Sequence, residues 1–208
     1  MKIGILALQG DFIEHIKVIQ KLGAQTVSVR QPEQLEGLDG LIIPGGESTT
    51  ILKLMHSYNL FQSIKELAES NLPIMGTCAG MVLLAKKVSN PDMNTLSLMD
   101  IEVRRNAFGR QLDSFETKIA IPLLGDELFP AVFIRAPLIE KAGADVDIIG
   151  RLPDNSIVAT RQGNILALSF HPELSDDSRI HRYFIDLITI HKAGDRKKAT
   201  LEVAIRAD

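Results

Sequence analysis

The stretch LPIMGTCAGMVLLA, residues 72–85, places the only cysteine of the chain between two glycines, where an apolar strand turns into a helix. Gly-x-Cys-x-Gly has the layout of a nucleophile elbow, a tight turn that carries a reactive atom at its tip. The start of a helix directs free N–H groups and a positive dipole end toward the sulfur, which favours the thiolate. Cys78 is therefore a candidate nucleophile, with a small buried apolar residue as the alternative.

Short apolar runs alternate with helical periodicity on both sides of this turn. The runs predict strands at 3–8, 26–29, 41–43 and 74–75, and the periodic segments predict helices at 12–22, 51–56, 60–68 and 79–87. Gly23 is a plausible end for the first helix. This β-α order predicts a doubly wound sheet with helices on both faces.

The second half of the chain has a different pattern. Short strand-like segments separated by turns lie at 98–103, 117–121, 132–136, 146–152, 156–161 and 165–170. They predict an antiparallel or mixed extension of the sheet. The last clear helix is predicted at 179–191, so we expect a single domain over residues 1–192 and a polar C-terminal tail over 193–208, whose last ten residues fit a helix or a strand.

Composition excludes several classes of partner. The 208 residues carry a net charge of −3, which does not indicate a nucleic-acid partner. One cysteine cannot form an internal disulfide. The apolar N-terminal run is too short for a signal peptide, and no apolar stretch reaches the roughly 20 residues that a membrane helix needs. We expect a soluble, cytoplasmic protein with no membrane or nucleic-acid partner.

A cysteine nucleophile needs a base, which a third group orients. His171 follows an apolar strand and opens the sequence HPE, in which Pro172 favours extended backbone. Side chains two residues apart in extended backbone face the same side, so Glu173 can orient the imidazole. The alternative is a simple turn with a solvated glutamate. The other four histidines lie in or near helical patterns and are interpreted as solvated or packing residues: His15, His56, His181 and His191.

The loop PGGEST, residues 44–49, also follows a strand and precedes a helix. Its two glycines allow backbone N–H groups to approach a ligand, and the helix start adds donors suited to an oxyanion or a carboxylate. No Gly-Lys-Ser/Thr follows, so it is not a phosphate loop. The alternative is a capping turn in which Ser48 or Thr49 begins the helix. Ala79, directly after the cysteine, is a second candidate oxyanion donor.

PGGEST, GTCAG and HPE occur in this order along the chain, and together they resemble the motifs of the class I, triad-type glutamine amidotransferases. Further segments are similar to the family of glutaminase subunits of pyridoxal 5′-phosphate synthase: LALQGDFIEH at 6–15, RNAFGRQLDSF at 105–115, FIRAP at 133–137 and SFHPEL at 169–174. The resemblance covers residues 1–191, and nothing is carried over to the tail.

The resemblance implies an α/β fold, a flavodoxin-like three-layer sandwich with a mixed central sheet and helices on both faces. It implies hydrolysis of L-glutamine to glutamate and ammonia through a thioester, with Cys78 as nucleophile, His171 as general base and acid, and Glu173 as orienter. Gly46 and Ala79 would form the oxyanion hole. The implied glutamine-binding residues are Gly46, Glu47, Ser48, Arg105, Ile134 and Arg135. The two arginines have an alternative role as surface or ion-pair residues.

The resemblance also implies a partner in a hetero-oligomeric complex, a (β/α)8-barrel synthase subunit that receives the ammonia. Pyridoxal phosphate is then the product of the complex, and this chain needs neither a cofactor nor a metal. We expect glutaminase activity to be weak alone and to rise on synthase binding, because the Gly45-Gly46 peptides can rotate easily.

Three alternatives stay open. The chain could be a class I glutaminase that serves a different acceptor enzyme, a stand-alone cysteine hydrolase or stress protein on a similar core, or a catalytically silent scaffold. RNAFGRQ and FIRAP argue against the first, HPE after the last sheet strand argues against the second, and the complete set of triad residues argues against the third.

Overall fold

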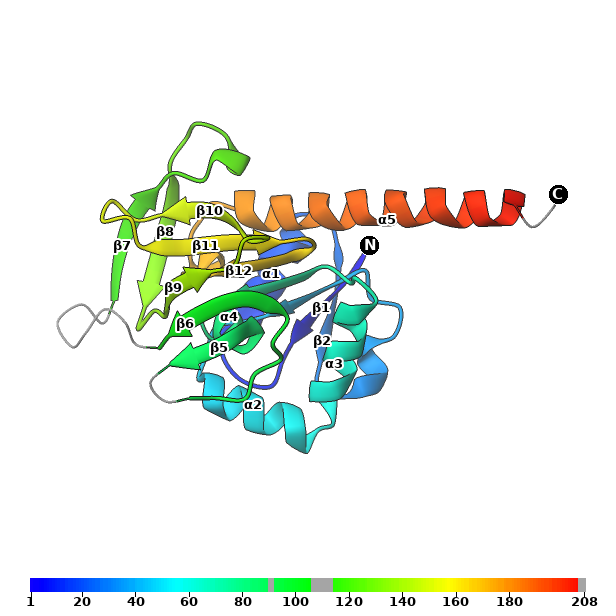
Figure 1. Ribbon diagram of the computed structural model, residues 1–208, viewed down its shortest axis with the longest axis horizontal. Helices are drawn as coiled ribbons and strands as arrows, with labels where there is room; N and C mark the ends of the chain where they lie inside the picture. The colour runs from blue at the N-terminus through cyan, green and yellow to red at the C-terminus, as the bar shows by residue number, and fades with distance from the viewer. Residues whose placement is uncertain (90–91, 106–113, 206–208) are drawn as a thin grey trace.

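The computed structural model describes residues 1–89, 92–105 and 114–205, with residues 195–205 described by their backbone alone. The first half alternates strands and helices as predicted (Figure 1). Its elements are β1 (Lys2–Leu6), α1 (Phe12–Lys21), β2 (Gln25–Val29), the short η1 (Pro32–Leu35), β3 (Gly40–Ile43), α2 (Ser48–Ser57), α3 (Leu60–Glu69), β4 (Ile74–Thr77) and α4 (Ala79–Leu84).

The second half is mostly β structure and ends in one long helix. Its elements are β5 (Ala85–Ser89), β6 (Met99–Arg104), β7 (Ser114–Ile119), η2 (Pro122–Leu124), β8 (Phe129–Ile134), β9 (Leu138–Ala142), β10 (Asp147–Arg151), β11 (Ile157–Gln162), β12 (Ile165–Leu168), η3 (Pro172–Leu174) and α5 (Arg179–Ile205).

The central sheet is mixed, as expected. Its strand order is β2-β1-β3-β4-β12-β11-β9-β6-β5, with β10 paired to β11, while β7 and β8 form a separate antiparallel pair. The five strands from β2 to β12 are parallel to one another. From β12 onward the pairs become antiparallel, until β5 pairs in parallel with β6.

Each face of the sheet buries its own core, because successive strand side chains point to opposite faces. Leu41 and Ile43 of β3 pack in one cluster with residues of α2, α3 and α4. Ile42, between them, packs in a second cluster with residues of α1, α5 and the β7–β8 pair. The chain is therefore the three-layer α/β sandwich that was expected, with helices on both faces (Figure 1).

The prediction of a helix over 79–87 was wrong in its second part, because α4 ends at Leu84 and β5 follows at once. The six residues of α4 are all buried, whereas Lys86 and Lys87 are exposed on β5. Across the parallel pair with β6, these two lysines contact Asp100 and Glu102, each at 2.8 Å. The backbone pairing with β6 and the charge pairs across the two strands favour a strand here. Strand β9 was also not predicted.

Two further boundaries differ from expectation. Helix α2 begins at Ser48, and the capping side chain is that of Glu47, which accepts from the N–H groups of Thr49 and Thr50. Helix α5 continues beyond 191 to Ile205, so the predicted polar tail is helical through that residue. Among the described residues, no helix is long and apolar enough to cross a bilayer.

Candidate active site

Four neighbouring parallel strands bring the predicted motifs to one edge of the sheet. β1, β3, β4 and β12 lie side by side and run in the same direction. Residues of the predicted motifs follow the ends of these strands: 9–11 after β1, Gly45–Glu47 after β3, Cys78 directly after β4, and His171 after β12. Open α/β sheets build their sites at this carboxyl edge.

Cys78 has the strained backbone that a nucleophile elbow requires. Its φ is 47° and its ψ is −103°, a conformation that costs a non-glycine residue about 1–3 kcal/mol. Its N–H donates to the carbonyl of Leu168 on β12 at 2.8 Å, and its own carbonyl accepts from Val82 in α4 at 3.2 Å. These contacts hold the turn between strand and helix. Cys78 is buried, with 8% of the residue exposed.

The glycines beside the cysteine are explained by close packing. A Cβ at Gly80 would lie 1.9 Å from the carbonyl oxygen of Ile43 on β3, and one at Gly76 would lie 2.7 Å from the carbonyl carbon of Gly80. Helix α4 therefore crosses the sheet at a distance that only glycine allows. This close crossing is what aims the first turn of α4 at the site.

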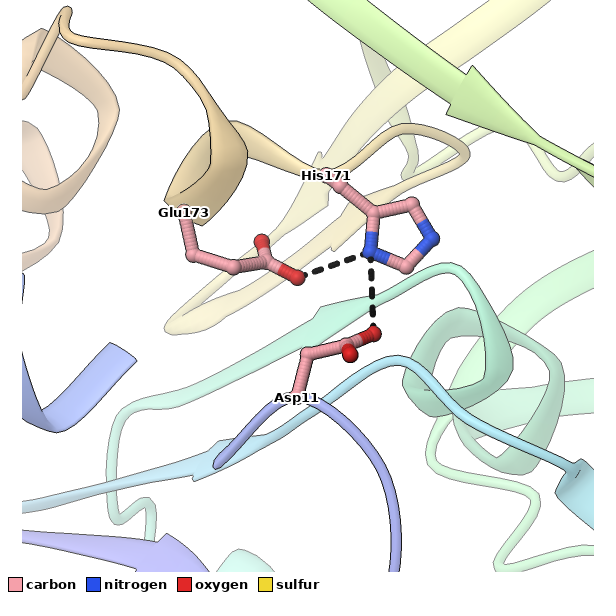
Figure 2. A group of neighbouring side chains, drawn as sticks. All are labelled: Asp11, His171 and Glu173. Atoms are coloured by element: carbon pink, nitrogen blue, oxygen red, sulfur yellow. Dashed lines mark hydrogen bonds and ion pairs between the residues drawn. The ribbon is translucent and has the colours of Figure 1, made fainter. Parts of the chain in front are cut away.

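The imidazole of His171 is oriented by Glu173. Nδ1 of His171 lies 2.7 Å from Oε1 of Glu173, and both side chains are buried (Figure 2). The N–H of His171 donates to the carbonyl of Val132 on β8 at 2.8 Å, which fixes the histidine backbone. Glu173 lies in the 3₁₀ turn η3 rather than in the extended segment that was expected. The predicted contact nevertheless forms, because the turn brings the carboxylate back to the Nδ1 edge of the ring (Figure 2).

Electrostatics favour a protonated His171. Burial by itself lowers the pKa of this imidazole, but hydrogen bonds to Cys78 and Glu173 and their charges raise it to about 10. Burial raises the pKa of Glu173, which its hydrogen bond to His171 opposes. Since Nδ1 bonds Glu173, the other ring nitrogen is the one available to the cysteine. The three residues thus form a candidate triad in the order Cys78, His171 and Glu173.

A second carboxylate, that of Asp11, also lies near this imidazole. Oδ2 of Asp11 is 3.5 Å from Nδ1 of His171, and its side chain is 39% exposed (Figure 2). Ligand atoms of Asp11, His171 and Glu173 lie within 4.8 Å of one another, as metal ligands would. Nδ1 is already hydrogen-bonded to Glu173, so we assign no metal to this group. Sequence reasoning missed Asp11, although it closely follows the end of β1 at the same sheet edge.

The glycine loop after β3 packs directly against the imidazole. A Cβ at Gly45 would lie 2.3 Å from Cε1 of His171. The carbonyl of Gly45 accepts from the N–H of Asp11 at 3.1 Å, and the N–H of Glu47 donates to Oε1 of Gln9 at 2.7 Å. The loop before α1 therefore holds the predicted oxyanion loop. The N–H of Ala79, at the first position of α4, has no acceptor within its own helix.

Part of the predicted glutamine-binding set gathers beside this loop. Arg105 donates to Oε1 of Glu47 at 3.1 Å and to Oγ1 of Thr49 at 3.2 Å. The carbonyl of Ile134 lies 3.8 Å from Sγ of Cys78.

The remaining members are less closely tied to the cysteine. Ser48 is buried in the first turn of α2. Arg135 is exposed and has a positive φ of 44°. Most of the RNAFGRQLDSF segment, residues 106–113, lies outside the described residues.

His15 was interpreted as a solvated or packing residue, and the structure gives it a more specific place. Its side chain is fully buried, and Nε2 lies 3.3 Å from Oε2 of Glu173. His181 of α5 is buried beside it. His15 and Asp11 are four residues apart at the start of α1, so helical spacing places them on one face.

The α/β sheet presents a strained cysteine, a histidine and a buried glutamate at one edge. This arrangement is that of a candidate thiol hydrolase with a catalytic triad. The particular family follows from comparison with known proteins. The profile of the SNO glutamine amidotransferase family matches residues 5–190, and the chain belongs to this family.

Two relatives that are more than 50% identical carry the same name. The pyridoxal 5′-phosphate synthase subunit PdxT of Dehalococcoides mccartyi is 56% identical over 194 residues, covering 92% of this chain and 100% of the relative. The protein of the same name from Moorella thermoacetica is 55% identical over 188 residues, covering 90% and 100%.

Solved structures agree on the fold. A crystal structure described as a glutamine amidotransferase is 45% identical, with a TM-score of 0.85 over 90% of this chain and 98% of that chain. A putative GMP synthase protein from Thermoplasma acidophilum, 19% identical, has a TM-score of 0.71 over 94% and 98% of the two chains and supports the fold alone.

Proposed function

We propose that Cys78, His171 and Glu173 hydrolyse the side-chain amide of L-glutamine to glutamate and ammonia. The chain is a glutaminase that supplies ammonia for the synthesis of pyridoxal 5′-phosphate, as its family membership and the names of its relatives support. The observation that carries the assignment of roles is the 2.7 Å contact between His171 and Glu173 beside a cysteine with positive φ.

The reaction runs in two acyl transfers, because an amide is a poor electrophile. The Cys78 thiolate attacks the side-chain carbonyl carbon of glutamine, and the carbonyl oxygen becomes an oxyanion. The C–N bond then breaks, with the proton of the His171 imidazolium passing to the departing nitrogen, which leaves ammonia and a thioester. His171, now neutral, takes a proton from water as the water attacks the thioester. Release of glutamate restores the thiolate and the imidazolium.

The oxyanion needs donors that are in place before the reaction. We assign this role to the N–H groups of Gly46 and Ala79, one from the loop after β3 and one from the start of α4. Each such donor lowers the barrier by about 3 kcal/mol in comparable sites. Because Gln9 and Asp11 hold the loop from the other side, the orientation of its peptides depends on the segment before α1.

Substrate binding is assigned to the residues that surround the cysteine. Gly46 and Ser48 offer backbone N–H groups at the start of α2, where a carboxylate is favoured, whereas the N–H of Glu47 is already donated to Gln9. The pairing of Arg105 with Glu47 holds the guanidinium beside this loop. Ile134 and Arg135 contribute from the end of β8, opposite the cysteine. Arg135 is exposed and free to approach a bound amino acid.

The acceptor of the ammonia is proposed to be a (β/α)8-barrel synthase subunit in a hetero-oligomer. The described residues, 1–89, 92–105 and 114–205, form one α/β sandwich. The relatives are named as a subunit of pyridoxal 5′-phosphate synthase, which supports an acceptor on another subunit. Pyridoxal phosphate is then a product of the complex. A cytoplasmic location is part of the same proposal.

The test is an ammonia-release assay on purified chain with glutamine, in the presence and in the absence of the synthase. Release of equimolar glutamate and ammonia supports the activity, and transfer of the nitrogen into pyridoxal phosphate supports the acceptor. Glutamine hydrolysis that is unaffected by the synthase, without product formation, would favour the alternative of a different acceptor enzyme.

A further inference from the structure

Behind the candidate triad lies a buried chain of polar side chains that the proposed mechanism does not use. Nε2 of His15 lies 3.3 Å from Oε2 of Glu173 and 3.2 Å from Oγ1 of Thr77. Nδ1 of His15 lies 2.9 Å from Nε2 of His181. The four side chains come from α1, η3, β4 and α5, and all are buried. This row of side chains connects the candidate active-site edge of the sheet to the C-terminal helix.

The outer oxygen of Glu173 needs a donor. Oε1 bonds His171, whereas Oε2 is buried and has no hydrogen-bond partner among the described residues. Nε2 of His15 lies 3.3 Å from this oxygen, and its hydrogen bond is made to Oγ1 of Thr77 at 3.2 Å. A buried carboxylate oxygen without a donor is costly. Burial also raises the pKa of Glu173. A donor at Oε2 therefore helps to keep the glutamate charged.

The direction of the hydrogen bonds in this network follows from its last member, His181. Nδ1 of His181 is buried with no hydrogen-bond partner among the described residues, so it carries a lone pair more readily than a proton. The proton of His181 then sits on Nε2 and donates to Nδ1 of His15. His15 consequently carries its own proton on Nε2, which faces Glu173 and Thr77. Burial lowers the pKa of both histidines, that of His181 to about 4, so each ring holds one proton.

We infer that His15 is a positioning residue of the triad: its Nε2–H is shared between Oγ1 of Thr77 and Oε2 of Glu173, and this holds the glutamate ionised and oriented toward His171. The inference rests on the proposed triad. Glu173 gains a fixed charge and in turn stabilises the imidazolium of His171. The groups that face this network are Asp11 and His171 near the glutamate, Thr77 of β4, and His181 of α5. Glu14 and Lys17 lie on the exposed side of α1.

The test compares two substitutions of one side chain. His15→Gln keeps an amide donor near the position of Nε2, whereas His15→Leu fills similar space without a donor. Glutamine hydrolysis is measured with the synthase present. We expect His15→Leu to lower kcat at least tenfold with little change in KM, and His15→Gln to retain kcat within a few-fold of the unsubstituted chain. His191→Gln, on α5 but bonded to Asn164, is the matched control and should leave kcat unchanged.

A second readout is independent of turnover. Cys78 is the only cysteine, so its alkylation by iodoacetamide can be followed as a function of pH. Without the donor, the negative charge of Glu173 is less stable, and the imidazolium of His171 loses part of its stabilisation. The cysteine thiolate is then less favoured, so the midpoint of alkylation in His15→Leu should move to higher pH. Unchanged kcat and an unchanged midpoint would overturn the inference. An equal loss in both folded His15 variants would overturn it as well, since the donor would then be irrelevant.

Nitrogen NMR of the unsubstituted chain needs no variant and covers the case in which His15→Leu does not fold. We expect both His15 and His181 to carry their ring proton on Nε2. A proton on Nδ1 of His15 would overturn the inference. Glu173→Gln separates this inference from the proposed function. If that variant keeps full activity, the triad itself is wrong. If it loses activity while His15→Leu does not, only the role of His15 fails.

Discussion

Thr77, the last residue of β4, pairs in register with Leu168, the last residue of β12. The parallel pair therefore ends level, and the next residues of the two strands begin the candidate site together. Cys78 donates its N–H across the pair to Leu168, and His171 follows three residues after that same leucine. Residues separated by more than ninety positions in the sequence meet because two strands end at the same height.

The first prediction concerns the nucleophile. Cys78→Ala should abolish glutamine hydrolysis, because no other thiol exists in the chain. The substitution removes only the thiol group and leaves the backbone hydrogen bonds of the turn, so binding to the synthase should persist. Product formation from added ammonium salt should then match that of the unsubstituted complex. Ammonia release from glutamine by the variant would show that the nucleophile is misassigned.

A second prediction concerns the orienter. Glu173→Gln keeps the size of the side chain but removes the charge that stabilises the imidazolium of His171. We expect kcat to fall by up to roughly 10⁴-fold, the loss seen when the acidic member of a Ser-His-Asp triad is neutralised. Steady-state kinetics with the synthase present provide the measurement. Asp11→Asn is a useful comparison, because Asp11 lies farther from Nδ1, at 3.5 Å rather than 2.7 Å, and should cost less.

Much of this site could be predicted from the order of strands and turns. Cys78, His171 and Glu173 each follow or lie near the end of a predicted strand, and parallel topology brings such ends together. His15 could not be recognised in the same way. Its place in α1 is typical of a surface or packing histidine, and only its contacts with Glu173 and His181 distinguish it.

The misjudged boundaries have a similar cause. Residues 79–87 are apolar and then basic, as a helix ending in lysines would be, and local propensity does not reveal the neighbouring strand. Lys86 and Lys87 adopt β structure because β6 offers both backbone partners and acidic side chains. Strand β9 was missed because its residues Glu140 and Lys141 interrupt the apolar pattern at an exposed face of the sheet. In both segments, pairing with a neighbouring strand determined the secondary structure.

A third prediction concerns the close approach of α4 to the sheet. Gly80→Ala should lower the free energy of unfolding by about 3 kcal/mol, because the added Cβ would meet the carbonyl oxygen of Ile43 at 1.9 Å. Neither backbone segment can move without disturbing β3 or the cysteine turn. Chemical denaturation of the two proteins provides the measurement. Gly163→Ala is a contrasting case in open space with a positive φ of 56°, where the cost is limited to the backbone conformation.

A fourth prediction concerns activation by the synthase. The loop of Gly45 and Gly46 packs against His171 and is hydrogen-bonded to Gln9 and Asp11, and its glycine peptides can reorient when a partner contacts this edge. We expect slow hydrolysis by the free chain and at least a tenfold higher kcat in the complex. Ammonia release is measured at increasing synthase concentration. Equal rates with and without the synthase would reject this form of regulation.

The last prediction concerns stability in acid. Burial lowers the pKa of His181 from its usual 6.5 to about 4, so the unfolded chain binds a proton there before the folded chain does. The stability contributed by the neutral ring is complete above pH 6.5 and is lost as the pH falls toward 4, by roughly 3 kcal/mol at about 1.4 kcal/mol per pKa unit. His181→Phe should therefore flatten the dependence of the unfolding free energy on pH in this window, whatever its effect at neutral pH. His191→Gln serves as the control on the same helix, and an unchanged slope in His181→Phe would show that His181 titrates normally in the folded chain.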